Sequence, residues 1–206
     1  MIEIHQLRKA YGERVILSVD RWTLGGSNVV LQGENGAGKT TLLLMLAGLE
    51  FPSSGHIEIQ GHAPQSEQAR AITSFAPDQP ALFDDLTVAD QMTYVARLHG
   101  LSEPFEVANT FAEALGAESL LDRFPRGMSK GQRQKSGLLV ATARPFELLL
   151  LDEPTTGLDE ASRLQLVEVL GTLADRGVMV VSSTHDVDLI AAADEVVRVA
   201  DGSLHA

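Results

Sequence analysis

The segment that decides the fold is Gly33–Thr40, which reads GENGAGKT and lies between the apolar stretch Val29–Leu31 and the leucine-rich stretch Thr40–Gly48. The pattern G-x-x-x-x-G-K-[ST] between a strand and a helix is typical of a loop that binds phosphate. Glycines let backbone N–H groups approach phosphate oxygens, and the helix N-terminus adds partial positive charge at the same place. We therefore predict a phosphate-binding loop here, in preference to a glycine-rich turn without a ligand.

Each residue type in this loop has an expected role. Lys39 supplies a full positive charge to the β- and γ-phosphates, and Thr40 offers a hydroxyl group to Mg²⁺. The residues expected to contact the nucleotide are Gly33, Glu34, Asn35, Gly36, Ala37, Gly38, Lys39, Thr40 and Thr41. A magnesium-bound nucleotide is thus the expected ligand.

The run Leu148–Leu151 is apolar throughout and is followed by Asp152 and Glu153. Such a run is typical of a strand buried on both faces, and ligands bind at the carboxyl edge of parallel sheets. We expect Asp152 to hold Mg²⁺ through water and Glu153 to act as general base for an attacking water. An acidic turn without a catalytic role is the alternative, and the phosphate loop favours the catalytic interpretation.

Alternating strand and helix patterns extend over the rest of the chain. The expected strands are Ile2–Leu7, Val15–Val19, Trp22–Leu24, Val29–Leu31, His56–Gln60, Ala71–Phe75, Leu148–Leu151, Val178–Ser182 and Glu195–Val199; the expected helices are Thr40–Gly48, Glu160–Arg176 and Asp186–Ala192, with a helical region at Leu86–Asp122. In that region apolar residues recur at helical spacing and are expected to share one face: Val88, Met92, Val95 and Leu98. The alternation predicts an α/β fold with a parallel sheet covered on both faces, preceded by antiparallel strands.

The composition of the 206 residues, 44% hydrophobic and 21% charged, is that of a globular protein of one domain. A net charge of −12 argues against a general nucleic-acid binder. The absence of cysteine excludes disulfides and cysteine nucleophiles. The longest apolar stretch, Leu42–Leu49, is far shorter than the roughly 20 residues that span a bilayer, and Met1–His5 does not begin a signal peptide. We expect contact with a membrane only through a partner.

The order of five motifs resembles that of the nucleotide-binding subunit of ABC transporters, over essentially the whole chain. The motifs are GENGAGKT, then MSKGQRQK at Met128–Lys135, LLLLDEP at Leu148–Pro154, Gly157-Leu158-Asp159 and Thr184-His185-Asp186. The phosphate loop alone fits many ATPases and GTPases, and the segment Ser129–Gln132 singles out the ABC class. The resemblance implies a P-loop NTPase core of mostly parallel sheet flanked by helices, with an antiparallel β subdomain and a helical subdomain at about residues 84–135, all in a single ABC ATPase domain of residues 1–206.

The resemblance also implies roles for single residues. Tyr11 corresponds to the aromatic residue that stacks on adenine. Asp159 lies in the loop that communicates across the dimer, and His185 corresponds to the switch histidine that contacts the γ-phosphate and helps to hold the hydrolytic water. The signature loop, which contacts the γ-phosphate held by the opposite subunit, corresponds to Ser129, Gly131 and Gln132. An ordinary turn aromatic at Tyr11 and a structural histidine at His185 are the alternatives.

Two positions depart from the family pattern. Phe75-Ala76-Pro77-Asp78 stands where the family usually has Tyr-Val-Pro-Gln, so Asp78 occupies the position of a glutamine that reaches Mg²⁺. Either the Asp78 carboxylate approaches Mg²⁺ in its place, or Gln79 fills the role after a shift of one residue. Lys130 stands where glycine is usual; it either adds charge near the γ-phosphate or points to solvent.

The implied function is ATP binding and hydrolysis that powers transport through a transmembrane permease. A second ATP-binding subunit, in a homodimer or a heterodimer, completes each site, with ATP and Mg²⁺ held between the two. The resemblance of Leu86–Leu101 to export-type families favours export, and Asp78–Val95 is the expected docking segment for the permease. The implied location is cytoplasmic, on the inner face of the cell membrane, with no nucleic-acid partner. A soluble ABC-type assembly or regulatory ATPase without a membrane partner is the alternative.

Overall fold

The computed structural model describes all residues from Met1 to Ala206 and contains two sheets. The larger sheet has six strands in the order β5-β6-β7-β3-β8-β9. These strands are β3 (Asn28–Gln32), β5 (Thr73–Ala76), β6 (Leu148–Asp152), β7 (Met179–Ser183), β8 (Glu195–Ala200) and β9 (Ser203–His205). Neighbouring strands are parallel except for β8 and β9, which are antiparallel. The predicted α/β fold with a mostly parallel sheet is confirmed.

The smaller sheet has three antiparallel strands in the order β2-β1-β4. The strands are β1 (Ile2–Tyr11), β2 (Arg14–Leu24) and β4 (Ser54–Ile59). Ile2 and Ile4 are buried and the residues beside them are not, because one face of this sheet packs on the protein interior. This sheet is the antiparallel subdomain expected from the sequence.

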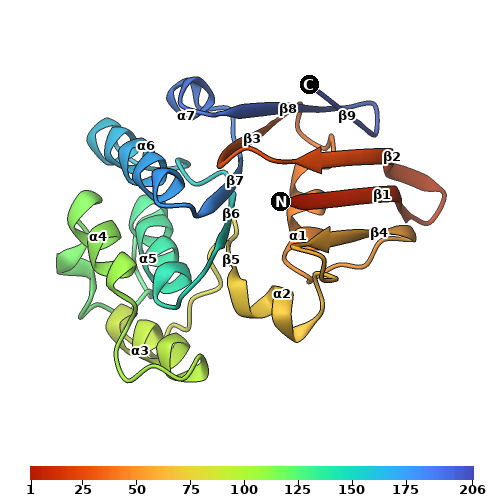
Figure 1. The fold of residues 1–206 in the computed structure, drawn as a ribbon. Helices are drawn as coiled ribbons and strands as arrows, with labels where there is room; N and C mark the ends of the chain where they lie inside the picture. The colour runs from red at the N-terminus through yellow and green to blue at the C-terminus, as the bar shows by residue number, and fades with distance from the viewer.

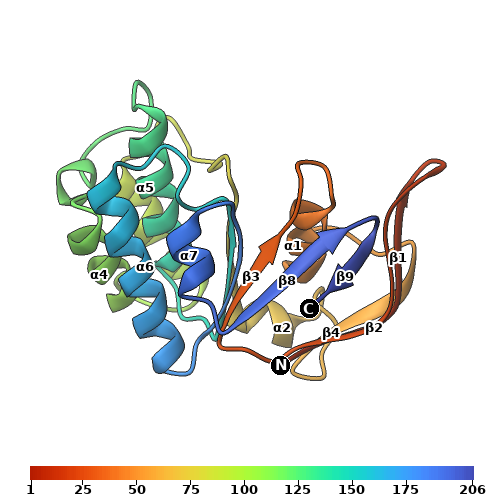
Figure 2. The ribbon, with the colours of Figure 1, turned by 90° about the horizontal axis from the view of Figure 1, so that it is seen from above.

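Helices cover the larger sheet on both faces (Figures 1 and 2). Figure 2 shows α4 to α7 on one side, and α1 on the other side between the larger sheet and the antiparallel strands. The helices are α1 (Lys39–Leu46), α2 (Glu67–Ile72), α3 (Val88–Leu98), α4 (Glu106–Ala114), α5 (Lys130–Thr142), α6 (Glu160–Asp175) and α7 (Val187–Ala191), with a 3₁₀ helix at Glu118–Leu120. The sheet is therefore a central layer, as the alternating pattern predicts.

Strand β6 separates two hydrophobic cores. Leu149 and Leu151 pack in the core formed with the helices α3 to α6, whereas Leu148 and Leu150 pack in the core around α1 and the smaller sheet. All four leucines are at most 2% exposed. Burial on both faces explains why this strand is continuously apolar instead of alternating.

The carboxyl ends of four parallel strands bring distant motifs together. β3 leads into Gly33, β5 into Asp78, β6 ends at Asp152, and β7 leads into His185. Because parallel strands share one direction, their carboxyl ends form one edge of the sheet, where ligands of such folds bind. The topology thus places the predicted site residues at a single edge.

Some predicted elements of the sheets were wrong in detail. Ala71 and Ile72 end α2 instead of beginning a strand, and β5 begins at Thr73. Ser66 caps α2 by accepting a hydrogen bond from the backbone N–H of Ala69 at 3.2 Å, and this cap was not predicted from the sequence. The two strands predicted at Val15–Val19 and Trp22–Leu24 are one continuous strand, β2, and β9 was not predicted.

The helical region predicted at Leu86–Asp122 is interrupted. A loop separates α3 from α4, because α3 ends at Leu98 and Gly100 then adopts a φ of 79°, the left-handed conformation that commonly terminates a helix. Val88 and Met92 are buried as predicted, but Leu98 at the end of α3 is 64% exposed and does not share their environment. The residues 84–135 contain α3, α4, the 3₁₀ helix and part of α5. That these residues form a distinct helical subdomain stays a prediction.

The helices of the chain are short. The longest, α6, has 16 residues. None combines the length and the apolar character needed to cross a bilayer.

Candidate functional site

Lys39 lies at the centre of the loop that precedes α1. Its ammonium group donates hydrogen bonds to the carbonyl oxygens of Gly33 at 2.6 Å and Glu34 at 3.3 Å. Gly38 caps α1 with a φ of 108°, a conformation that residues with a Cβ rarely adopt. The loop therefore wraps around a cation that contacts two carbonyl oxygens and a histidine at the start of a helix, and an anion is its natural ligand.

Asp152 is held next to the first turn of α1. The Thr40 hydroxyl donates to Asp152 Oδ2 at 2.8 Å, and the Ser183 hydroxyl donates to Asp152 Oδ1. Asp152 is only 4% exposed, so these contacts fix both carboxylate oxygens in a buried position. Two of the residues predicted to serve Mg²⁺, Thr40 and Asp152, are thus in direct contact.

Glu153, His185 and Lys39 form a cluster beside this pair. His185 Nε2 lies 3.6 Å from Glu153 Oε1 and 3.3 Å from Lys39 Nζ. Burial raises the pKa of the Glu153 carboxyl above its ordinary value, although the neighbouring His185 and Lys39 act to lower that pKa. A partly buried carboxyl group with a raised pKa, next to a phosphate loop, has the character expected of a general base.

The segment that carries His185 is anchored by an arginine from α6. The Arg163 guanidinium lies 3.2 Å from Asp186 Oδ2 and also pairs with Asp188. Asp186 Oδ1 in turn accepts hydrogen bonds from the backbone N–H groups of Asp188 at 3.0 Å and Leu189 at 3.1 Å, at the start of α7. The residue next to His185 is therefore fixed both to α6 and to α7.

A cavity of about 600 Å³ lies against the phosphate loop. Its lining includes Lys39, Thr40, Asp152, Glu153 and two further predicted candidates, Asp78 and Gln79. Asp78 Oδ1 is buried and has no hydrogen-bond partner. The structure thus brings both candidates for the magnesium-reaching position to the same cavity.

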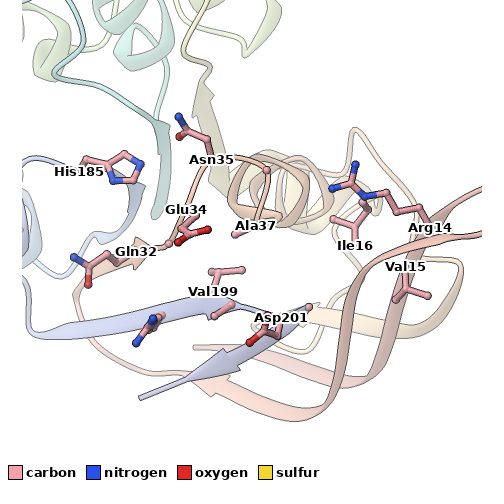
Figure 3. Close-up of a pocket in the computed structure, with 15 residues that line it drawn as sticks. Arg14, Val15, Ile16, Gln32, Glu34, Asn35, Ala37, His185, Val199 and Asp201 are labelled. Carbon is pink, nitrogen blue, oxygen red and sulfur yellow. The ribbon is translucent and has the colours of Figure 1, made fainter.

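A second cavity, of about 720 Å³, flanks the same loop (Figure 3). Gln32, Glu34, Asn35 and His185 line one part of it, and Arg14, Val15, Ile16 and Asp201 line the other. Four residues border both cavities: Arg14, Ile16, Asn35 and Gly36. The phosphate loop is therefore accessible from two sides.

The predicted signature residues lie away from these cavities. Ser129 caps α5: its hydroxyl accepts from the Gln132 N–H at 3.2 Å, and Gln132 Oε1 accepts from the Ser129 N–H at 3.0 Å. Ser129, Gly131 and Gln132 line neither of the two cavities beside the phosphate loop. One copy of the chain does not bring the two halves of the predicted site together.

The start of α5 rests on the loop that precedes α6. A Cβ atom at Gly131 would lie 2.2 Å from the carbonyl oxygen of Gly157, so the two backbones touch. Lys135 Nζ lies 3.4 Å from Asp159 Oδ2, which adds a second contact between the same segments. The signature segment and the predicted communication loop therefore form one packed unit.

Tyr11 ends β1 and is 49% exposed. It lines neither cavity beside the phosphate loop, but its partner residue on β2, Arg14, lines both. The Tyr11 hydroxyl donates to Glu50 Oε1 at 3.4 Å. The structure places the predicted base-stacking residue at the rim of the phosphate cavities instead of inside them.

The family model for ABC transporters matches residues 22–156 of this chain. The chain belongs to the ABC transporter family. This ABC-type ATPase is 33% identical to the SkfA peptide export ATP-binding protein SkfE of Bacillus subtilis, over 99% of this chain and 87% of SkfE. It is also 33% identical to the sn-glycerol-3-phosphate import ATP-binding protein UgpC of Vibrio cholerae, over 99% of this chain and 57% of UgpC. A solved ATP-binding subunit of an ABC transporter superposes on the whole chain with a TM-score of 0.88 at 28% identity.

Sequence reasoning missed three contributors to the site of this ABC ATPase. Ser183 was expected only to follow a strand, yet it pairs with Asp152 across β7 and β6. Its position at the polar end of an apolar strand is a signal that could have identified it. Arg14 and Ile16 of β2 line the cavities through tertiary contact, which no local pattern indicates.

Removal of the Asp159 cap is expected to reduce stability in a pH-dependent way. Hydrogen bonds from Ser162 and the nearby Lys135 lower the pKa of Asp159 to about 2. A carboxyl group with a lowered pKa stabilises the fold above its ordinary value of 3.8, and this contribution is lost as the pH falls towards about 2. Asp159→Ala should therefore lower the free energy of unfolding at pH 7 by about 1 kcal/mol, the usual cost of an N-cap.

Urea unfolding at a series of pH values checks this expectation. The difference between the wild type and Asp159→Ala should shrink as the pH is lowered below 3.8. Glu160→Ala, which removes the neighbouring carboxylate but not the cap, is the control. A difference that is constant with pH would contradict the assigned role of the charge.

Proposed function

We propose that this ABC ATPase hydrolyses ATP to power export of a substrate through a transmembrane permease. One observation carries the catalytic part: Lys39, Thr40, Asp152, Glu153 and His185 meet around the cavities that flank the phosphate loop. The triphosphate of ATP supplies the anion that the Lys39 ammonium lacks, and the N-terminus of α1 adds partial positive charge.

The residues present fit a magnesium ion. Thr40 and Asp152 offer a hydroxyl and a carboxylate, the hard oxygen ligands that Mg²⁺ prefers, and Asp78, which has one buried oxygen without a hydrogen-bond partner, lines the same cavity. Protein side chains alone do not form a metal site here, since no group of three or more acidic or histidine side chains is arranged so that it could hold a metal ion. A site of this kind suits an ion that also binds phosphate oxygens, and Mg²⁺ would stabilise their charge.

Glu153 is the proposed general base. Its carboxylate accepts a proton from the attacking water as the new bond to the γ-phosphorus forms and the bond to the β–γ bridging oxygen breaks. His185 lies 3.6 Å from Glu153 and 3.3 Å from Lys39, and in this proposal it would contact both this water and a γ-phosphate oxygen. Water activation and charge stabilisation would then occur side by side.

A second ATP-binding subunit completes the site in this proposal. Ser129, Gly131 and Gln132 line neither cavity in one copy, so the phosphate loop needs them from another subunit. The N-terminus of α5 can present backbone N–H groups to the γ-phosphate held opposite. The subunits would close on ATP and open after hydrolysis, in a homodimer or a heterodimer.

The permease would dock in the groove between β5 and the helices α3 and α5. This groove has a volume of about 320 Å³, and Pro77, Pro80 and Leu82 are among its lining residues. Phe83 and Tyr94 lie edge to face beside it and are 55% and 50% exposed. Docking here would connect the permease with Asp78 and hence with the ATP site, and would hold the chain at the cytoplasmic face of the membrane.

Two observations support export over import. The segment Leu86–Leu101 resembles export-type families, and SkfE, which matches over nearly all of its own length, is a peptide export protein by name. UgpC, an import protein by name, matches over a smaller share of its length. Export of a peptide or another small molecule is therefore the direction that we propose.

Co-expression with the permease tests the proposed partner. The wild-type chain should fractionate with the membrane and should hydrolyse ATP faster with its permease than without it. Phe83→Asp should shift the chain to the soluble fraction, whereas Val187→Asp, a change at a residue of α7 that is 72% exposed, should not. ATP hydrolysis without membrane association of the wild type would instead favour a soluble assembly or regulatory ATPase.

Asp78→Gln is expected to leave ATP hydrolysis largely intact. Glutamine restores the side chain that the family usually carries, and its carbonyl oxygen can still serve Mg²⁺. Steady-state ATPase rates should stay within about tenfold of the wild type, or roughly 1.4 kcal/mol of barrier. A larger loss would show that the unpaired carboxylate oxygen has a role of its own, and Gln79→Ala tests the alternative candidate in parallel.

A further inference from the structure

Along β1, an irregularity changes which residues point to the buried face of the smaller sheet. Ile2 and Ile4 are buried, but after an irregularity between His5 and Arg8 the buried residues are Leu7 and Lys9. Gln6, inside this irregularity, has a φ of 46°. Because side chains alternate along a strand, the shift puts Tyr11 on the same face as Lys9 instead of on the outer face.

Lys9 is an unusually buried cation. It is 7% exposed, and its ammonium group donates to Glu50 Oε2 at 2.6 Å and to the carbonyl oxygen of Phe51 at 2.8 Å. The same ammonium group lies 4.8 Å from the centre of the Tyr11 ring. The Tyr11 hydroxyl donates to the other carboxylate oxygen of Glu50. Lys9 therefore contacts the face of the ring, and Glu50, its ion-pair partner, contacts the hydroxyl group.

Other hydrogen bonds also hold the loop after α1 against β1. Backbone and side-chain bonds already do so: the Ser53 N–H donates to the Arg8 carbonyl at 2.7 Å, and the Ala10 N–H donates to Ser53 Oγ at 3.0 Å. What the Lys9–Glu50 pair adds is the orientation of one aromatic ring. Half of Tyr11 remains exposed, at the rim that its partner Arg14 shares with the phosphate cavities.

We propose that Lys9, together with Glu50, is a positioning residue that holds the Tyr11 ring as a platform for the adenine base. The inference rests on the proposed function, because it assigns the base-binding part of the same ATP site. Lys9 covers one face of the ring and leaves the other face to the base. Glu50 follows α1, so the platform is tied to the segment that carries the phosphate loop.

The affinities for ATP and for inorganic tripolyphosphate separate base from phosphate binding. Lys9→Met should weaken ATP binding by roughly five- to tenfold, since base–aromatic stacking is lost in part, and should leave tripolyphosphate binding unchanged. Lys9→Arg keeps a cation over the ring and should restore ATP binding. Arg8→Met removes the same charge from an exposed neighbour and should change neither affinity.

Each outcome has a distinct meaning. An unchanged ratio of the two affinities in Lys9→Met, or an equal loss of both, would overturn the positioning role. If Lys9→Met does not fold, Glu50→Gln provides the same comparison from the partly exposed side of the pair. Wild-type protein that binds neither ligand would contradict the proposed function itself.

Discussion

Glu153→Gln should abolish ATP turnover while ATP binding remains. Glutamine has the shape of glutamate but cannot take a proton from the attacking water, so the rate should fall by about 10²- to 10⁴-fold. The groups that hold the phosphates, Lys39 and Thr40, are untouched by this change. Turnover measured under saturating ATP, beside the dissociation constant of ATP, checks both parts of the expectation.

The same substitution makes a prediction about stability. Burial raises the Glu153 pKa, so the charged form is disfavoured in the fold and the wild type loses stability as the pH rises above 4.5. Glu153→Gln should therefore be more stable than the wild type at pH 7, and the difference should decrease towards pH 4.5. Turnover close to the wild-type rate would refute the assignment of Glu153 as base, whatever the stability shows.

Gly131→Ala should reduce ATP hydrolysis by roughly tenfold or more. An overpacked contact costs about 1–3 kcal/mol, and a loss of about 1.4 kcal/mol in the stabilisation of the transition state lowers the rate tenfold. The added methyl group would lie 2.2 Å from the Gly157 carbonyl oxygen, and a backbone atom cannot move aside as a flexible side chain can. The start of α5 must then shift away from the loop that leads to Asp159. In the proposed dimer this shift misplaces the signature residues relative to the γ-phosphate.

A matched glycine tests whether the effect is local. Gly171 lies within α6, and a methyl group added there would meet no other part of the chain within 4 Å, so Gly171→Ala should leave hydrolysis unchanged. ATP binding by a single Gly131→Ala subunit should also be unchanged, because Gly131 lines neither cavity beside the phosphate loop. Wild-type hydrolysis in Gly131→Ala would argue against the signature role of this segment.

The catalytic half of the site could be predicted because it is encoded locally. The phosphate loop and the acidic end of β6 each combine a residue pattern with a strand, and strand ends determine where side chains meet in a parallel sheet. The pairing of Thr40 with Asp152 at 2.8 Å follows from that topology. The resemblance to ABC transporters added residues with weak local signals, such as His185 and Tyr11.

Features that depend on tertiary contact could not be predicted. The ion pair between Lys9 and Glu50 joins residues 41 positions apart, and nothing in either segment indicates the other. The strand expected at Ala71–Phe75 was misplaced because a short capped helix and a strand share an apolar stretch. The exposure of Leu98 likewise depends on where α3 ends, which the helical spacing alone does not fix.

Arg163 gives the predicted communication loop a structural link to His185, the predicted switch histidine. Asp159 caps α6, and Arg163 follows it by one turn of roughly 5.4 Å in the same helix. The two side chains therefore belong to one continuous rigid element. The Arg163 side chain forms an ion pair with Asp186, the residue that follows His185 in the chain. In the proposed dimer, a displacement of the Asp159 cap by the neighbouring subunit would therefore reach His185 through α6 and Arg163, without a rearrangement of the larger sheet.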